Sequence, residues 1–428
     1  MKKAEWRKKD CGDLSRERKK EGTEKKKSRA RIGRSALFSS GMGKMDFPPI
    51  VSQFSEEKNS SSPQSHSSLP PFSGANELPG RLLAWYDTHA RVLPWRENTD
   101  PYRVWISEIM LQQTRVETVK PYFERFLKQF PDLASLASAS EERLLKAWEG
   151  LGYYNRARNL QKTARLLLER HHGQFPDSAE ELQALPGIGE YTAGAILSIC
   201  FRHPVPAVDG NVLRVFARLT ENRTASEHRE KLREEAASFF MTVHSEERCG
   251  DFTQALMELG ATICLPNGIP LCGKCPLQEL CLARKHGTET EFPAKKIRKT
   301  RLKEEKTVLL LLCGNRTALR KRPGGEEDNG RNANKGLLAG LWEFPSFDGL
   351  ISEEEEIASR LRLQGVEGLS FRKLPRAKHV FTHREWIMSG WLVICGNMAE
   401  PFHWATPEEL HSDIALPSAF KAFRRFLP

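Results

Sequence analysis

Four of the nine cysteines fall within eighteen residues of one another, in the pattern Cys264-x7-Cys272-x2-Cys275-x5-Cys281. Four thiolates in one short loop can hold a [4Fe–4S] cluster or a structural zinc ion, and the spacing alone does not decide which. Helix-forming residues before Cys264, without paired Cys-x2-Cys knuckles, argue against a zinc ribbon. In either case the metal site is structural, because four protein ligands leave no open coordination position.

Two acidic residues have surroundings in which a carboxyl group could do acid–base chemistry. Glu108 lies in a largely apolar stretch, residues 105–114, with the pattern of a helix. Burial without a partner would raise the pKa of this carboxyl and keep it protonated near neutral pH, as a general acid requires. Asp209 opens an apolar helix. The alternatives are a surface glutamate on an amphipathic helix and an aspartate that only caps its helix.

A glycine-containing turn, LPGIGEYTA at residues 185–193, separates two helical stretches. Gly187 and Gly189 let the backbone approach a ligand closely, and the helix that follows presents its N-terminal N–H groups. Such a turn can hold a DNA phosphate without reading the base sequence. An ordinary turn between helices is the alternative.

Helices must position these residues, because amphipathic segments alternate with short Pro and Gly breaks from about residue 77 to residue 284. The prolines predicted to interrupt them are Pro121, Pro131, Pro176, Pro186 and Pro206. After a charged, apolar-poor stretch the pattern changes to that of an α+β domain. Strands are predicted at 307–312 and 386–394, short helices at about 353–363 and 417–426, and a loop insertion at 324–335.

The chain has 428 residues, enough for two or three domains, and a net charge of +11. This charge is a weak argument for a nucleic-acid partner, because residues 1–34 alone carry fifteen Lys and Arg against six Asp and Glu. Residues 1–75 are predicted to form a disordered leader. Its basic stretch at 25–31 suits a nuclear signal or a DNA-contacting arm. The alternatives are a solvated tail, or sequence upstream of a start at Met42 or Met45.

Membrane and secreted classes are disfavoured. No apolar run approaches the eighteen or so residues of a membrane-spanning helix, and no apolar stretch follows the first lysines as in a secretory signal. The cysteines outside the loop are scattered, which suits a reducing compartment better than a disulfide framework. We therefore expect an intracellular protein that is located with DNA, either in a bacterial cytoplasm or nucleoid or in a eukaryotic nucleus.

These features together resemble the helix-hairpin-helix DNA glycosylase superfamily, which includes endonuclease III. The resemblance rests on the glycine turn, on Asp209 about twenty residues after it, and on the cysteine loop. Three further stretches are similar to the MutY-type adenine DNA glycosylases: SEIMLQQT at 107–114, GLGYY at 150–154 and RARNL at 156–160. The resemblance extends from about residue 78 to the C-terminus.

The resemblance implies a reaction and roles for four residues. A monomer would act on duplex DNA that carries adenine opposite 8-oxoguanine or guanine, and would flip the adenine out of the stack. Glu108 would protonate the adenine ring, while Asp209, ionised at an ordinary pKa, would stabilise the positively charged sugar, electrostatically or through a covalent adduct. Tyr191 and Asn211 would orient Asp209 and the incoming water. Endonuclease III-type enzymes carry a Schiff-base-forming lysine at the position of Tyr191, so a monofunctional glycosylase is expected.

The cofactor that the resemblance implies is a [4Fe–4S] cluster on the four cysteines of the loop. The residues that it assigns to DNA and base binding are Trp95, Arg96, Gln112, Gln113, Thr114, Tyr153, Gly187, Gly189, Gln254, Phe381, Thr382 and His383. Tyr153 would wedge into the stack, with Gln113 and Thr114 lining the gap near the oxidised guanine. The adenine pocket would be lined by Trp95, Arg96 and Gln254.

The C-terminal part resembles the Nudix-like domain of MutY-type enzymes through GLLAGLWEFP at 336–345. The glutamate-rich stretch at 353–360 lacks the REXXEE motif that a metal-binding Nudix hydrolase needs. The family's Phe-Ser-His recognition loop appears as Phe381, Thr382 and His383, where Thr keeps the hydroxyl and adds a methyl group. An ordinary strand edge with the aromatic ring packed inward is the alternative. Seven residues, 265–271, separate the first two loop cysteines where similar proteins usually have six.

The predicted organisation is a leader at 1–75, a helical glycosylase domain at 76–285 with its cluster loop at 264–281, a linker at 286–305, and a Nudix-like 8-oxoguanine recognition domain at 306–428. Three other functions fit the sequence less well. Tyr191 disfavours a bifunctional lyase, and the missing REXXEE motif disfavours a nucleotide-pool hydrolase. The presence of Glu108 and Asp209 disfavours a non-catalytic DNA-binding protein.

Overall fold

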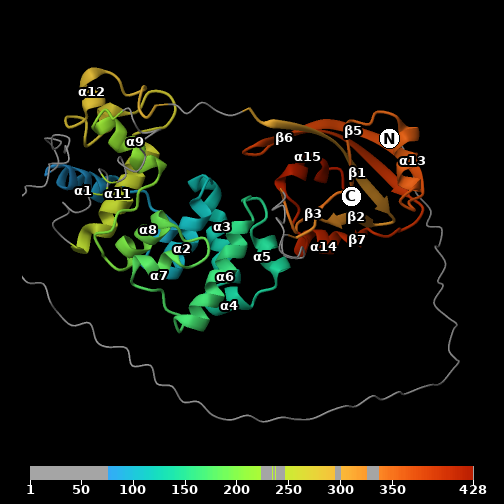
Figure 1. The fold of residues 1–428 in the computed structure, drawn as a ribbon, viewed down its shortest axis with the longest axis horizontal. Coiled ribbons are helices and arrows are strands. Elements are labelled where there is room, and N and C mark those ends of the chain that lie inside the picture. The colour runs from blue at the N-terminus through green and yellow to red at the C-terminus, as the bar shows by residue number, and fades with distance from the viewer. Residues whose placement is uncertain are drawn as a thin grey trace, which may run out of the picture. The chain divides into compact units, whose positions relative to one another are not determined.

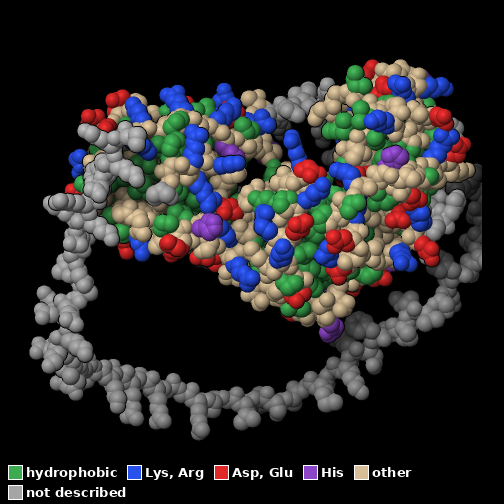
Figure 2. Space-filling view, turned by 180° about the vertical axis from the view of Figure 1, so that it is seen from behind, with side chains coloured by type: hydrophobic (Ala, Val, Ile, Leu, Met, Phe, Trp, Pro, Cys, Tyr) green, Lys and Arg blue, Asp and Glu red, His purple; other side chains and the backbone are tan. Residues whose placement is uncertain are grey.

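The computed structural model describes residues 76–222, 246–294, 300–324 and 337–427, together with positions 234 and 237. The predictions for the leader at 1–75 and for most of the loop insertion at 324–335 lie outside these residues. Within the described ranges, no helix combines the length and apolar character that a membrane crossing requires. Acidic and basic side chains lie interspersed on the face drawn in Figure 2, so this face does not carry charge of a single sign.

Helices make up the described residues as far as 294, drawn from blue to yellow in Figure 1. They are α1 Leu78–His89, η1 Pro94–Arg96, α2 Pro101–Leu111, α3 Val116–Gln129, α4 Leu133–Ser138, α5 Glu141–Ala147, α6 Asn155–Arg170, α7 Ala179–Gln183, α8 Glu190–Cys200, α9 Gly210–Leu219, η3 Glu246–Arg248, α11 Cys249–Thr262, η4 Cys272–Lys274 and α12 Leu282–His286.

Four of the five prolines expected to interrupt helices lie outside them, at 131, 176, 186 and 206. The prediction is wrong for Pro121, which lies inside α3. A proline there removes one backbone hydrogen bond. The helix nevertheless continues, because Val119, Phe123 and Phe126 on either side of the proline are buried in the core.

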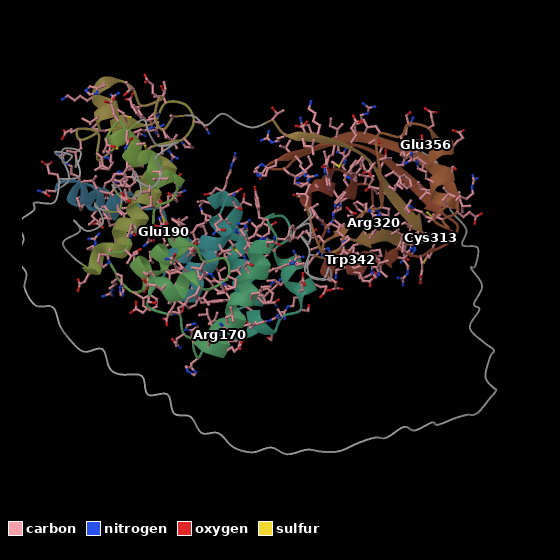
Figure 3. The ribbon with its side chains drawn as sticks, in the orientation of Figure 1. Arg170, Glu190, Cys313, Arg320, Trp342 and Glu356 are labelled. Carbon is pink, nitrogen blue, oxygen red and sulfur yellow. The ribbon has the colours of Figure 1, made fainter. Side chains whose placement is uncertain are left out.

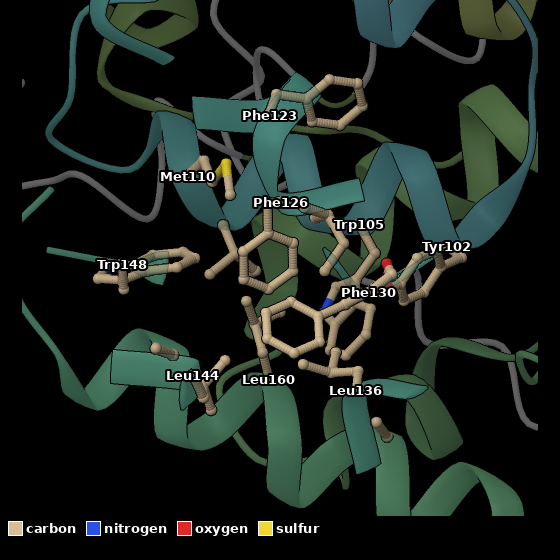
Figure 4. Packing of buried hydrophobic residues seen from close by; sticks show 14 of the residues in the cluster. Tyr102, Trp105, Met110, Phe123, Phe126, Phe130, Leu136, Leu144, Trp148 and Leu160 are labelled. Atoms are coloured by element: carbon tan, nitrogen blue, oxygen red, sulfur yellow. Dashed lines mark hydrogen bonds between the residues drawn. The ribbon is translucent and has the colours of Figure 1, made fainter. Parts of the chain in front are cut away.

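Two hydrophobic cores hold the helices together. The first gathers aromatic residues around α2 and α3, among them Trp105, Phe126 and Trp148, which Figure 4 shows from close by. The second packs α1, α9 and α11 against one another, with Phe216 and Phe252 fully buried. Helix α2 thus belongs to the first core and α9 to the second. Each of these two helices positions one carboxylate of the site described below.

The described residues from 300 onward form a seven-stranded mixed sheet with flanking helices. The strand order is β3-β2-β1-β6-β5, with β4 paired to β1 and β7 paired to β2. Strands β1 and β6 are parallel, whereas β5 and β6 are antiparallel. Figure 3 labels Arg320 and Trp342 on the adjacent strands β2 and β3. The elements are β1 Leu302–Cys313, β2 Arg316–Lys321, β3 Trp342–Glu343, β4 Ser346–Asp348, α13 Glu354–Arg362, β5 Gly368–Val380, β6 Arg384–Cys395, β7 His403–Ala405, α14 Pro407–Ser412, η5 Ser418–Phe420 and α15 Lys421–Arg424.

Strand β1 explains the continuous apolar run near residue 310. Val308 and Leu310 contribute to one core and Leu309 and Leu311 to another, and all four side chains are fully buried. Successive side chains of a strand point to opposite faces, so a strand that is covered on both faces is apolar at every position. The strand begins at Leu302, before the start at 306 expected for this domain.

The two short helices predicted in this part have different outcomes. The prediction at 353–363 corresponds to α13. The prediction at about 417–426 is confirmed as helical, but in two consecutive pieces, since residues 418–420 form the 3-10 helix η5 and α15 follows directly. Phe420 in η5 and Phe423 in α15 are both fully buried, so the two pieces pack on the same core.

Candidate active site

Glu108 is a buried carboxyl group on α2, with 5% of its surface exposed. Its neighbours Trp105 and Ile109 pack into the first core and fix the helix. The hydroxyl of Tyr191, in the first turn of α8, donates a hydrogen bond of 2.8 Å to Oε2 of Glu108. Two predicted site residues that are far apart in the sequence are therefore in direct contact, and the surface-helix alternative for Glu108 is wrong.

The surroundings of Glu108 favour its neutral form. Burial raises the pKa of Glu108 to about 7, and the nearby charge of Asp209 raises it as well. The Tyr191 hydrogen bond and the charge of Arg96 act in the opposite direction but do not offset the burial. Near neutral pH this carboxyl is therefore protonated in a large share of the molecules, which is the state required to donate a proton.

Asp209 is the N-cap residue of α9. Its Oδ1 accepts 2.8 Å hydrogen bonds from the backbone N–H groups of Asn211 and Val212, and its Oδ2 accepts one of 2.7 Å from the Asn211 side-chain amide. Capping fixes the direction of the carboxylate and does not exclude a chemical role. Burial raises the pKa of Asp209 as well. The hydrogen bonds lower this pKa but do not offset the effect of burial, so the expectation of an ordinary pKa is wrong.

The Asn211 side chain continues this network toward the cysteine loop. Its Oδ1 accepts a hydrogen bond of 3.0 Å from Arg214, whose Nε donates at 2.8 Å to the carbonyl of Cys264. Two residues, Asn211 and Arg214, thus connect the Asp209 carboxylate to the backbone of the first loop cysteine. Asp209 and the backbone of that loop are thus parts of one hydrogen-bond network.

Trp95 and Arg96, expected to line the base pocket, are adjacent on η1, and Gln254 is half-buried on α11. Sequence reasoning missed Glu258, a fully buried residue of α11. Its carboxylate forms an ion pair of 2.9 Å with Arg96 and a second one with Arg91. An acidic residue within an apolar helix was the available signal, the same signal that singled out Glu108.

Two loops with unusual backbone geometry carry the residues expected at the opened base pair. Gln113 and Tyr153 adopt left-handed conformations, with φ of 57° and 48°, which cost energy for residues with a Cβ. Gln113 is exposed, Gln112 and Thr114 are half-buried, and the Tyr153 side chain is 51% exposed. The Tyr153 hydroxyl lies 2.8 Å from Oγ1 of Thr382.

The glycine turn leads directly into α8, whose first residue, Glu190, is labelled in Figure 3. Gly187 has φ of +80°, and a Cβ there would lie 2.9 Å from Cβ of Asn159, so a larger residue would be strained and crowded. Gly189 is the N-cap of α8. Both glycines are exposed, as a backbone contact to a phosphate requires.

The four loop cysteines line one hollow together with apolar residues of the second core. Nη1 of Arg218 donates a hydrogen bond of 3.1 Å to Sγ of Cys264. Burial raises the pKa of Cys275 to about 12 and that of Cys281 to about 11, so an incoming metal must displace protons from these thiols. Among the described residues, no three His, Cys, Asp or Glu side chains converge as they would on a single metal ion. A hollow edged by four sulfurs fits a cluster that occupies the space between them.

The segment 265–271, which is one residue longer than usual, contains an exposed part. The N–H groups of Leu265 and Leu271 both donate 3.0 Å hydrogen bonds to the carbonyl of Ile263, which ties the two ends of segment 265–271 together. Between these ends, Gly268 adopts a left-handed φ of 75° and Ile269 is 82% exposed. An added residue can therefore extend the exposed part of the segment without moving its ends.

Phe381, Thr382 and His383 form the turn between β5 and β6, so the alternative of an ordinary strand edge is wrong. The N–H of Phe381 donates 2.8 Å to the carbonyl of Arg384, which closes the turn. The Phe381 ring packs against Trp386 at 4.9 Å between centroids, while Thr382 and His383 are exposed. The aromatic residue thus anchors the turn, while Thr382 and His383 lie at the surface and the Thr382 hydroxyl contacts Tyr153.

Comparisons with known proteins agree with the two parts of the fold. The HhH-GPD superfamily of base excision DNA repair proteins matches residues 106–240, and the NUDIX domain family matches residues 307–425. The chain is 34% identical to the adenine DNA glycosylase of Homo sapiens over 410 residues, which cover 81% of this chain and 73% of that protein. It is 38% identical to the Mus musculus adenine DNA glycosylase over 71% of this chain and 67% of that protein. Identity to the Buchnera aphidicola subsp. Baizongia pistaciae enzyme is 35%, over 73% of this chain and 85% of that protein.

Proposed function

The chain belongs to the adenine DNA glycosylase family, and on that premise we propose that it excises adenine paired with 8-oxoguanine or guanine in duplex DNA. The observation that carries the proposal is the buried Glu108, which accepts a hydrogen bond from Tyr191 and lies near a second carboxylate, Asp209. Two carboxyl groups with different surroundings are what acid-assisted cleavage of a glycosidic bond requires.

Glu108 supplies the proton. Adenine leaves the base stack, since its glycosidic bond is out of reach inside the duplex. The neutral Glu108 protonates the adenine ring, so the bonding electrons of the glycosidic bond depart with a neutral base. A raised pKa serves this step, because the group must be protonated at neutral pH and lose its proton during the reaction.

Asp209 stabilises the sugar, which becomes positively charged as the bond breaks. Its three hydrogen-bond donors hold the carboxylate in one orientation and favour its ionised form. Asn211 supplies two of these donors, and Tyr191 orients the water that adds to the sugar. That water gives up one proton, which restores neutral Glu108. Tyr191 has no amine, so no Schiff base forms and the DNA strand stays intact.

Other residues select the substrate. Trp95, Arg96 and Gln254 line the adenine pocket, and Tyr153 enters the gap in the stack beside Gln112, Gln113 and Thr114. Gly187 and Gly189 hold a phosphate. Thr382 and His383 read the base opposite adenine, with Phe381 as the anchor of their turn. Recognition of the opposite base is required for specificity, because adenine itself is the same in A:T pairs and in damaged pairs.

The four cysteines would hold a [4Fe–4S] cluster. When bound, the cluster supplies a structural centre that orders the loop. Arg218 stabilises the Cys264 sulfur, and Arg214 transmits the position of the loop backbone to Asn211. The protein residues therefore connect a structural site to the orientation of Asp209, with no chemistry required of the cluster itself.

One assay tests the proposal. Purified protein is mixed with end-labelled duplexes that contain A:8-oxoguanine, A:G or A:T, and the products are resolved with and without alkali. We expect alkali-dependent breaks at adenine in the first two duplexes and none in the third. Breaks without alkali would indicate a lyase, and equal breakage of A:T would refute the proposed specificity. Hydrolysis of free nucleoside triphosphates would favour a Nudix hydrolase instead.

A further inference from the structure

Arg156, near the start of α6, connects the two loops that flank the proposed opening in the DNA. Its Nη1 donates to the carbonyls of Ile109 at 2.7 Å, Met110 at 3.0 Å and Gln112 at 2.7 Å. Its Nη2 donates to the carbonyls of Leu151 at 3.0 Å and Gly152 at 3.1 Å, and lies 3.4 Å from Oγ1 of Thr114. One guanidinium group thus binds backbone oxygens on both loops.

Both loops contain a residue in the left-handed conformation, and Arg156 binds the backbone beside each one. The carbonyl of Gln112 directly precedes Gln113, and the carbonyl of Gly152 directly precedes Tyr153. Left-handed conformations of residues with a Cβ persist only where surrounding contacts hold them. The arginine carbon Cζ also lies 5.6 Å from the centroid of the Tyr153 ring, within cation–π range.

The first loop is also the end of the helix that carries Glu108. The carbonyls of Ile109, Met110 and Gln112 lie where α2 ends, so they have no helical partner and carry partial negative charge. A cation there stabilises the helix end and sets the direction in which the chain leaves it. Arg156 thereby determines where residues 112–114 stand relative to Tyr153.

We propose that Arg156 is a positioning residue. It holds Tyr153 and Gln113 in fixed positions relative to each other before DNA binds, so that both enter the opened base pair together. The inference rests on the proposed excision of adenine. Arg156 need not touch the reacting atoms. It acts by keeping two strained loops in the conformation that duplex opening requires, which lowers the conformational cost of that step.

Another role for a cation at a DNA-binding surface is contact with a phosphate. The contacts of Arg156 argue against it, because its two terminal nitrogens already donate to five carbonyls and its Nε is buried. Substitution of Arg156 by lysine distinguishes the positioning role from contact with a phosphate. Lysine keeps the charge that a phosphate needs but lacks the planar fork that reaches two loops at once.

The test compares R156K with the wild-type protein under single-turnover conditions. Arg165→Lys is the matched control, since Arg165 lies on the same helix and its Nε donates to a single carbonyl, that of Ala137. On an A:8-oxoguanine duplex we expect R156K to be roughly 100-fold slower, in line with the effect of misplaced positioning groups. Arg165→Lys should stay within about twofold. An R156K rate equal to that of the wild type would overturn the proposal.

A second duplex distinguishes positioning from general damage to the protein. It carries the same A:8-oxoguanine pair with one mismatched base pair on either side, so that the stack is already weakened. The R156K deficit should shrink on this duplex to about tenfold or less, because less of the opening depends on the two loops. An equal deficit on both duplexes would overturn the proposal, since a loss of active protein acts on every substrate alike.

Amide hydrogen exchange without DNA provides a readout that does not depend on activity. Exchange should become faster in R156K at residues 109–114 and 151–154, and should stay unchanged in α9 and the sheet. Unchanged exchange in both loops would refute the positioning role. R156Q, which keeps a planar donor, is the second variant if R156K does not fold. Wild-type protein that released no adenine would refute the proposed function instead, while the exchange experiment would still decide whether Arg156 orders the loops.

Discussion

Replacing Glu108 by Gln should abolish adenine release and, at alkaline pH, make the protein more stable. The amide keeps the shape of the side chain and can still accept the Tyr191 hydrogen bond, but it has no acidic proton to donate. A residue kept for chemistry at the expense of folding stability is expected to show both effects. A residue kept for stability would show neither.

The magnitude follows from the pKa of Glu108. Burial raises it from 4.5 to about 7, so between these pH values the folded protein keeps a proton that the unfolded chain has lost. The free energy of unfolding of the wild type therefore falls as pH rises through this window. At about 1.4 kcal/mol per pH unit, the ionised, buried carboxylate costs about 3 kcal/mol above pH 7. The side chain of the Gln variant does not ionise, so its free energy of unfolding lacks this pH-dependent loss.

Urea unfolding of the two proteins at pH 4.5 and pH 8 measures this difference. We expect similar stabilities at pH 4.5 and a variant that is more stable by about 3 kcal/mol at pH 8. Glu124→Gln, at an exposed position of α3, is the control and should show no such divergence. The single-turnover rate of the wild type should fall as pH rises through about 7. A constant stability difference at both pH values, or substantial adenine release by the Gln variant, would refute the assignment of Glu108 as the buried acid.

Asp209→Asn should also remove adenine release and spare duplex binding in a gel-shift assay; a variant that only melts at a lower temperature would mean that Asp209 acts as a helix cap alone. Tyr191→Phe should give no borohydride-trapped adduct with DNA, as for the wild type, and trapping at high yield would show that a lysine elsewhere acts as a nucleophile. The purified protein should be brown, and Cys275→Ser should lose iron in metal analysis and adenine release together; a colourless protein with one zinc per chain would contradict the cluster. His383→Ala should reduce the preference for A:8-oxoguanine over A:G by roughly ten- to hundredfold, as loss of one base contact does, and an unchanged ratio of single-turnover rates would exclude this turn as the reader.

Local patterns in the sequence were sufficient for the fold class and for the types of residue in the site. An all-α part followed by a part with a sheet is confirmed, as is the membership of the family that the motifs indicated. The helix over Glu108, the cap at Asp209 and the strand at 307–312 are all present. Each of these depends on neighbours within a few positions along the chain, where helical and strand periodicity are visible.

Only the tertiary structure decided which side chains meet. Tyr191 and Glu108 are 83 positions apart in the sequence, and Arg156 is 47 positions from the carbonyl of Ile109. Such pairs are set by how helices pack, which depends on the whole core and leaves no periodic trace near either residue. The same reason explains why the ion pairs of Glu258 with Arg91 and Arg96 could not be foreseen and why the pKa of Asp209 is raised. Burial is a property of the assembled fold, and the free energy of a buried charge is decided by partners that arrive from distant parts of the chain.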